Sequence, residues 1–232
     1  MAAIRLQSFR APLNAVVIGA SGGLGGAFAE LLGTCEDVGV LLLCARSDRV
    51  PDAVHLDLAD EASIAAAAET AQRRLGEIDL VIIATGMLHE GEGLRPEKTL
   101  RALSASALGR SFALNAIGPA LVAKHFLPLL PRDRKAVFAA LSARVGSITD
   151  NQVGGWYAYR AAKAALNQLI RTAAIELARK HPLAVCVTLH PGSVDTALSR
   201  PFQGGLRPEK RLAPTGGARQ LLGVVDGLDA TG

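Results

Sequence analysis

The residues best suited to acid–base chemistry are Tyr159 and Lys163. They stand four positions apart in a stretch that predicts a helix, so their side chains share one face. A free phenol has a pKa of about 10, and a nearby ammonium stabilises the phenolate and lowers this pKa. Such a pair predicts a tuned general acid, as the reduction of a carbonyl requires. Tyr157 cannot form the same pair, because position 161 is alanine.

A glycine cluster, Gly19-Ala20-Ser21-Gly22-Gly23-Leu24-Gly25, follows the short apolar run 15–18 and precedes a stretch with helical spacing. Glycines at this place allow a tight turn and a close approach of the backbone to a pyrophosphate. The helix that follows offers free N–H groups and a positive dipole to the phosphates. The residues that we expect to contact a dinucleotide here are Gly19, Ser21, Gly23, Leu24 and Gly25.

Two other interpretations of this cluster stay open. One is a plain turn between a strand and a helix. The other is the G-x-S-x-G elbow of serine hydrolases, with Ser21 as nucleophile, although no convincing Asp and His follow in the required order. A P-loop is excluded, because no Lys-Ser or Lys-Thr follows the glycines.

The cofactor's identity depends on the end of the second predicted strand, roughly 20 residues after the glycines, where NAD-binding folds place an acid on the ribose. Here the sequence has Arg46, and an arginine suits the 2′-phosphate of NADP. We therefore expect NADP to be preferred, with NAD as the alternative. Asp57, followed by Leu58, could bind the adenine or could simply cap a turn.

Apolar runs alternate with helical stretches along the chain. The expected strands are 15–18, 38–44, 54–56, 80–84, 136–141 and 184–189, and the expected helices are 24–32, 62–75, 108–130, 157–180 and 216–225. Strands that are apolar on both faces imply a parallel sheet covered on both sides. We predict an α/β single-domain Rossmann fold over residues 1–232, with a doubly wound parallel sheet and helices on both faces.

Composition excludes several classes of protein. The 232 residues include 25 Lys and Arg against 21 Asp and Glu, a mild excess without the basic stripe of a nucleic-acid-binding protein. Three scattered cysteines suggest neither disulfides nor a metal site. We find no run of about 18 apolar residues and therefore predict no membrane span. A cytoplasmic protein is expected.

Several motifs together closely resemble the short-chain dehydrogenase/reductase family. They are the glycine turn, Ala84-Thr85-Gly86 in place of Asn-Ala-Gly, Asn115, the Tyr159–Lys163 pair, and Pro191-Gly192-Ser193-Val194-Asp195-Thr196. The segments 142–148 and 154–157 are similar to the C-factor and sniffer-type carbonyl reductase branch. The resemblance implies that Asn115 helps to hold a proton-relay water. It also implies that Ala84, Thr85, Gly86, Tyr159, Lys163, Pro191, Gly192, Val194 and Thr196 contact the cofactor.

The sequence departs from the family pattern at the catalytic serine. The usual position is Ala143 here, so Ser142, one residue earlier, is our first candidate and Ser147 the second. Gly22 stands where many NADP enzymes of the family carry a basic residue. The family also adds a strand after its last helix, and the printed sequence ends at Gly232 before one.

The resemblance implies an oxidoreductase that moves a hydride between a nicotinamide cofactor and a carbonyl or alcohol. The alternative is a cofactor-binding signalling or sensor protein with little catalysis. Trp156 and Tyr157 could line the substrate pocket or pack at the start of a helix. Residues 197–212 resemble a loop that covers the substrate, with Gly204 and Gly205 as a hinge and basic side chains at Arg200, Arg207, Lys210 and Arg211. Paired long helices imply a homodimer or homotetramer.

Overall fold

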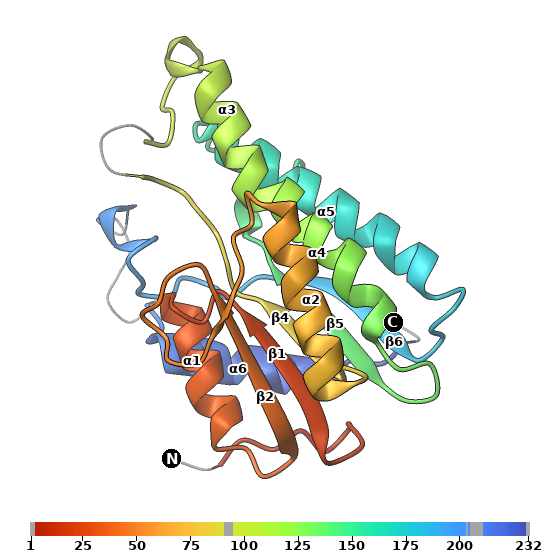
Figure 1. Cartoon of the computed structure of the whole chain (residues 1–232). Helices are drawn as coiled ribbons and strands as arrows, with labels where there is room; N and C mark the ends of the chain where they lie inside the picture. The colour runs from red at the N-terminus through yellow and green to blue at the C-terminus, as the bar shows by residue number, and fades with distance from the viewer. Residues whose placement is uncertain (1–2, 91–94, 203, 205–210, 231–232) are drawn as a thin grey trace.

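The structure is a computed structural model that describes residues 3–90, 95–202, 204 and 211–230. Its centre is one parallel six-stranded sheet in the order β3-β2-β1-β4-β5-β6 (Figure 1). The strands are β1 (Leu13–Ile18), β2 (Val38–Ala45), β3 (Val54–His55), β4 (Leu80–Ile83), β5 (Ala136–Leu141) and β6 (Ala184–Leu189). The predicted fold class is confirmed.

The strands form because their side chains are buried on both faces. Every residue of β4 and β5 is buried, and β1 is buried except at Asn14, which lies near its start. β-Branched and aliphatic side chains fit this two-sided environment. Strand order reverses between β1 and β4, which pair in register at Ile18 and Ile83. In an open parallel sheet, ligands bind at the carboxyl ends of the strands beside such a reversal.

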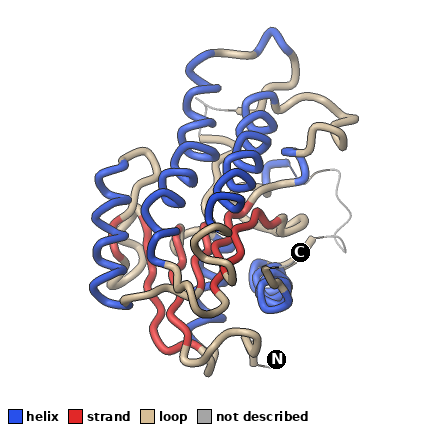
Figure 2. Tube along the Cα trace, turned by 90° about the vertical axis from the view of Figure 1, so that its right-hand side faces the viewer, coloured by secondary structure: helices blue, strands red, loops and turns tan. Residues whose placement is uncertain are grey.

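Helices cover both faces of the sheet, as Figures 1 and 2 show. Helices α1 (Gly23–Gly33) and α6 (Pro214–Gly227) pack on one face, with Phe28, Leu32 and Leu222 in their core cluster. Helices α2 (Glu61–Leu75), α4 (Gly118–Phe126) and α5 (Tyr157–Leu177) cover the other, where Phe126 and Leu166 are fully buried. Two apolar cores therefore hold the sheet rigid beneath the site.

The predicted helix 108–130 is interrupted. It consists of α3 (Ala105–Phe112), a π-helical turn (Ala113–Ile117), α4 and a 3-10 turn (Leu127–Leu129). A π turn inside an α-helix frequently marks a functional position. Apolar periodicity continues through the turn, so no local pattern predicts it.

The same run, Ala105–Leu129, is long and apolar enough to cross a membrane by length and composition, with a hydropathy of 1.2. The run is not continuously apolar, because it carries charged side chains at Arg110 and Lys124. Val122 and Phe126 are fully buried against the sheet. The run is a core helix.

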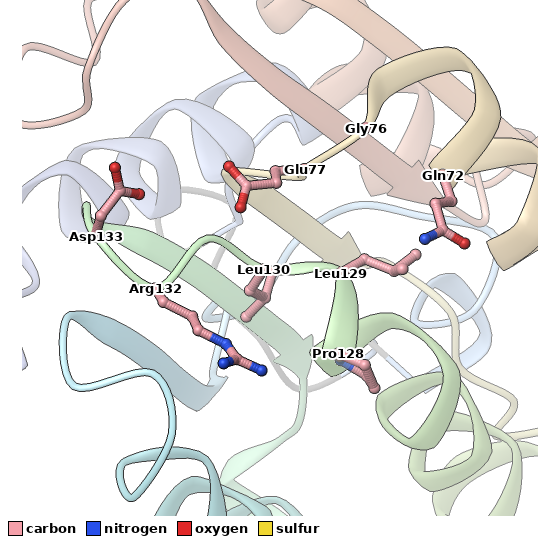
Figure 3. A pocket seen from close by; sticks show the side chains of 8 residues that line it. All are labelled: Gln72, Gly76, Glu77, Pro128, Leu129, Leu130, Arg132 and Asp133. Carbon is pink, nitrogen blue, oxygen red and sulfur yellow. The ribbon is translucent and has the colours of Figure 1, made fainter.

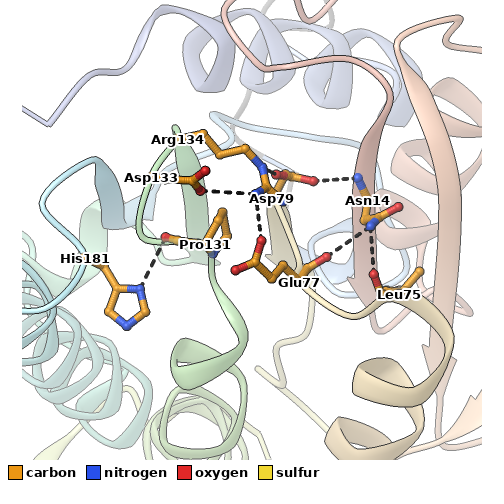
Figure 4. Close-up of polar contacts among 8 residues, drawn as sticks. All are labelled: Asn14, Leu75, Glu77, Asp79, Pro131, Asp133, Arg134 and His181. Atoms are coloured by element: carbon orange, nitrogen blue, oxygen red, sulfur yellow. Dashed lines mark hydrogen bonds and ion pairs between the residues drawn. The ribbon is translucent and has the colours of Figure 1, made fainter.

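The amino ends of the strands carry a polar network that stabilises the fold (Figure 4). The carboxylate of Asp79, which is nearly fully buried, accepts hydrogen bonds from the Arg134 guanidinium at 2.7 Å and from the Asn14 backbone at 2.8 Å. Arg134 also contacts Glu77. A shallow hollow lies close by, lined by Gln72, Gly76, Glu77, Pro128, Leu129, Leu130, Arg132 and Asp133 (Figure 3). Because strands are parallel, this hollow is at the opposite end of the sheet from the glycine turn.

Most predicted elements are confirmed with small shifts at their ends. Strands 136–141 and 184–189 have the predicted bounds, whereas the last predicted helix is longer at both ends. Short 3-10 turns at Leu100–Ala102, Arg144–Gly146 and Arg200–Phe202 were not predicted. Within the described residues no strand follows α6.

Candidate active site

The glycine turn links β1 to α1 at the carboxyl edge of the sheet. Gly19 has a φ of +89°, a left-handed conformation that glycine adopts without strain. A Cβ on Gly25 would lie 2.0 Å from the Gly19 carbonyl oxygen, so this helix packs too closely on the turn for any side chain. Gly22 caps α1 without a side-chain hydrogen bond. The first turn of α1 is therefore built to present backbone N–H groups to an anion.

Two neighbouring glycines, Gly25 and Gly26, should differ in how well they tolerate a side chain. Gly25→Ala should displace the turn and lower both the melting temperature and the affinity for a dinucleotide, because overpacking costs about 1–3 kcal/mol. Gly26→Ala is the matched control, since its Cβ would meet the nearest atom at 3.5 Å. Thermal unfolding and a cofactor titration of both variants check the difference. Equal behaviour of the two would contradict the assignment of the turn.

A pocket of about 340 Å³ opens directly beside this turn. Among the residues expected to bind the cofactor, those that line it are Gly19, Ser21, Arg46, Asp57, Leu58, Ala84, Thr85 and Gly86. They come from the ends of β1, β2, β3 and β4, which the sheet order places side by side. The pocket thus gathers side chains that are far apart in the sequence.

Charged groups surround the mouth of the pocket. The exposed Arg46 follows β2, and Glu90 lies across from it, paired with Arg110 at 3.1 Å. The Arg110 guanidinium holds the pKa of the Glu90 carboxyl below its usual value, with a smaller contribution from Arg46. The Asp57 carboxylate accepts a hydrogen bond from the Ala59 backbone at 3.0 Å. Asp57 therefore caps a turn and also lines the pocket, and its binding of the adenine stays a prediction.

Three features of the pocket fit a dinucleotide. Gly19, Ser21 and Gly22 of the turn line it, and the two glycines among them put no side chain between the pocket and the backbone. The Thr85 hydroxyl is buried in the pocket wall and has no partner among the described residues. A Cβ on Gly23 would lie 2.9 Å from the methyl group of Thr196, which brings the segment after β6 to the turn.

Close packing also positions segment 191–196 beside the glycine turn. Gly192 has a φ of +73°, and Val194 forms a backbone bridge with Leu212. A Cβ on Gly217 in α6 would lie 2.9 Å from Val194 and 3.6 Å from Leu24. Some residues expected to contact the cofactor do not line the pocket itself: Pro191, Gly192, Val194 and Thr196 of this segment, and Gly23, Leu24 and Gly25 of the turn.

The covering loop was expected to include Gly205, Arg207 and Lys210, which lie outside the described residues.

Tyr159 and Lys163 project from the first turns of α5 and are both buried, with exposures of 9% and 2%. The Lys163 ammonium lies 5.8 Å from the centre of the Tyr159 ring and donates a 2.8 Å hydrogen bond to the Leu141 carbonyl. Burial raises the pKa of Tyr159 to about 12 and lowers that of Lys163 to about 8. The phenol pKa is thus raised and not lowered, because burial disfavours the charged phenolate.

Asn115 lies in the π turn and is fully buried. Its side-chain oxygen accepts a hydrogen bond from the Met87 backbone at 2.9 Å, and its amide nitrogen donates to the Met87 carbonyl at 2.7 Å. The amide also donates to the Ser111 carbonyl at 3.1 Å. Asn115 therefore fixes the segment after β4, which carries Thr85 and Gly86, to the long helix.

The two candidate serines have different surroundings. Ser142 is buried at the end of β5, and its hydroxyl donates to the Asn167 side chain at 2.7 Å. Asn167 lies one helical turn beyond Lys163, on the same face of α5. The Ser147 hydroxyl accepts a hydrogen bond from the Asp150 backbone at 3.2 Å, within its own loop. Of the two hydroxyls, that of Ser142 is hydrogen-bonded to α5, whereas that of Ser147 is bonded within its own loop.

Sequence reasoning missed several residues around the site. Met87, Glu90 and Leu114 line the pocket. Glu97 is buried and accepts a hydrogen bond from the Ala158 backbone at the start of α5. These residues lie in irregular loops or at the π turn, where no periodic pattern marks them.

Comparison with known proteins shows which family the chain resembles. The short chain dehydrogenase family model matches residues 13–205. The chain is 38% identical to C-signal of Myxococcus xanthus over 122 residues, covering 53% of this chain and 68% of that protein.

Two solved structures have the same fold. NADPH-bound carbonyl reductase from chicken fatty liver superposes with a TM-score of 0.81 at 25% identity, covering 96% of this chain and 90% of that one. Carbonyl reductase Sniffer of D. melanogaster gives 0.77 at 20% identity, covering 95% and 93%, a likeness of fold alone. The chain therefore belongs to the short-chain dehydrogenase family of NAD(P)-dependent oxidoreductases.

Proposed function

We propose that this protein is an NADP-preferring oxidoreductase that acts on a carbonyl/alcohol pair through Tyr159. The observation that carries the proposal is the buried Tyr159 and Lys163 pair next to the pocket. Neither residue lines the pocket, but a Cβ on the lining residue Gly86 would lie 3.9 Å from the Lys163 ammonium. A carbonyl reductase bound to NADPH superposes on the chain, which supports both the reaction type and the cofactor.

The pocket lining and the family resemblance together support an assignment of residues to the parts of the cofactor. The glycine turn and Ser21 would bind the pyrophosphate, Arg46 the 2′-phosphate, and Asp57 with Leu58 the adenine. Ala84, Thr85 and Gly86 would line the dinucleotide's path, and the segment 191–196 would hold the nicotinamide end. When bound, the cofactor supplies the hydride that reduces a carbonyl carbon.

The chain's own residues supply the proton. With a pKa of about 12, Tyr159 keeps its proton at neutral pH and can donate it to the oxygen of a substrate that gains a hydride. Lys163 would stabilise the resulting phenolate, and Ser142 would hold the carbonyl oxygen. Asn115 acts as a positioning residue through Met87.

The direct test is a screen of uncharged and charged aldehydes and ketones with NADPH, followed by loss of the reduced cofactor's absorbance. We expect turnover with some members of the panel. Cofactor binding without any turnover would instead favour a signalling or sensor protein. The similarity to C-signal supports this alternative.

Arg46 predicts how the two cofactors differ. Arg46→Ala should weaken NADPH binding about tenfold to a hundredfold, because a charge-assisted hydrogen bond is worth about 1.5–3 kcal/mol. NADH binding should change little. Arg49→Ala, an exposed arginine of the same loop that does not line the pocket, is the control. Equal losses for NADPH and NADH would refute the role of Arg46.

The two serines make a separate prediction. Ser142→Ala should lower kcat by about 10²-fold or more, since loss of one donor to a developing oxyanion has this cost. Ser147→Ala should leave kcat near the wild-type value, because its hydroxyl serves its own loop. Steady-state kinetics of both variants decide between them, and the reverse ranking would transfer the role to Ser147.

The assembly and cellular location also stay predictions. Exposed Ile117, Leu169 and Ile175 lie on the long helices that we expect to pair in a homodimer or homotetramer. A cytoplasmic location is expected from the sequence.

A further inference from the structure

An aromatic cluster lies beside Tyr159 and joins three segments of the chain. The Trp156 ring contacts the Tyr159 ring at 6.5 Å between centroids and the Phe202 ring at 5.3 Å, both edge to face. His89 contacts Phe202 from the other side at 5.6 Å. We call Trp156, Phe202 and His89 the aromatic wall. Its members come from the start of α5, from the turn after β6 and from the loop after β4.

Trp156 is held in an unfavourable conformation. Its φ is +54°, in the left-handed region that a bulky residue rarely adopts, and Gly154 and Gly155 before it are also left-handed. Such strain persists only where surrounding contacts enforce it, and it is concentrated at functional sites. Simple packing at the start of a helix would not require it.

Two charged residues, Glu97 and Arg160, hold this conformation through hydrogen bonds. The backbone carbonyl of Glu97 accepts the Trp156 N–H, and its carboxylate accepts the Ala158 N–H at 3.2 Å. The other carboxylate oxygen is buried without a partner among the described residues. On the opposite side, the Arg160 guanidinium donates to the Gly155 and Gly154 carbonyls at 2.9 and 3.2 Å. The indole is thereby fixed toward Phe202 and Tyr159.

An apolar side chain and paired cations lie in the segments around the wall. Leu198 approaches Gly86, where a Cβ would lie 3.5 Å from its methyl group. The described cations nearby are paired: Arg200 with Asp195 at 3.0 Å, and Arg144 with Asp150 at 3.1 Å. The basic loop expected to attract an anionic substrate therefore offers no free cation at Arg200.

We propose that Trp156 and Phe202 determine specificity, and that the site takes uncharged aldehydes and ketones whose substituent is a flat aromatic group. This inference rests on the proposed function. An aromatic substituent can stack edge to face against fixed rings, and an apolar wall penalises a charged substituent through desolvation. The carbonyl group would then face Tyr159.

The kinetic test compares benzaldehyde, propanal and 4-carboxybenzaldehyde as substrates with NADPH. We expect kcat/KM for benzaldehyde to exceed the other two at least tenfold. Phe202→Ala and Trp156→Leu should lower kcat/KM for benzaldehyde about tenfold or more, mostly through KM, with changes below about threefold for propanal. Trp156→Gly should lose the same discrimination without a lower melting temperature, because glycine relieves the left-handed strain. Tyr157→Leu, an exposed aromatic next to the wall, is the control.

Binding can be measured apart from catalysis, because Trp156 is the only tryptophan in the sequence. Without cofactor, benzyl alcohol should change its fluorescence saturably, propan-1-ol should not, and Phe202→Ala should weaken the response. If no carbonyl is turned over but benzyl alcohol binds in this way, the proposed function is wrong, whereas the aromatic wall still binds flat aromatic groups. Turnover without aromatic preference, equal losses for all substrates in the variants, or no saturable fluorescence change with benzyl alcohol would overturn the inference.

Discussion

Tyr159→Phe should reduce carbonyl turnover by about 10²–10⁴-fold, the usual contribution of a general acid. The substitution removes only the hydroxyl that donates the proton, and the ring can keep its contact with Trp156. NADPH affinity should therefore stay within about threefold of wild type. Steady-state kinetics and a cofactor titration of the purified variant measure both quantities.

The matched control for this prediction is Tyr157→Phe. Tyr157 lies on the same turn of α5 but is 37% exposed and faces away from Lys163 in the helical repeat. Its kcat should equal that of the wild type. Full turnover in Tyr159→Phe, or an equal loss in both variants, would remove Tyr159 from the mechanism.

Lys163→Met should abolish measurable turnover and also change how stability depends on pH. The buried ammonium has a pKa of about 8 in the folded chain, against 10.5 for an ordinary lysine. Between these values the unfolded chain binds more protons than the folded chain, so the free energy of unfolding rises with pH. Relative to Lys163→Met, the wild type should gain about 2–3 kcal/mol between about pH 7 and about pH 10.

Chemical denaturation at a series of pH values, on wild type and variant in parallel, measures this difference. Lys180→Met is the control, because Lys180 is exposed beyond the end of the same helix. Its stability should follow the wild-type curve at every pH. Parallel curves for the wild type and Lys163→Met would show that Lys163 is not held in a site that penalises its charge.

The fold was predictable because its signals are local. Strands buried on both faces leave continuous apolar runs, as in Ala136–Leu141, and a turn that must approach a helix closely leaves glycines at Gly19 and Gly25. The Tyr159 and Lys163 pair was found for the same reason, since helical spacing alone places both side chains on one face.

The rest of the site depends on contacts between distant segments. Nothing near Trp156 in the sequence indicates that Phe202 packs against it. The single glutamate at position 97, in a loop far from α5 in the sequence, carries no pattern that predicts its hydrogen bond to the start of this helix. The π turn at Asn115 is hidden by continuous apolar spacing. The pKa of Tyr159 was expected to fall, because residue spacing reveals the neighbouring ammonium but not the depth of burial.

The proposed function is tested most directly by a calorimetric titration of the protein with NADPH and with NADH. We expect saturable binding of one NADPH per chain and weaker binding of NADH, because we propose that the glycine turn binds the phosphates and that Arg46 binds the 2′-phosphate. Tighter binding of NADH would contradict only the proposed role of Arg46. Binding of neither cofactor would contradict the proposal that this is a nicotinamide-dependent oxidoreductase site.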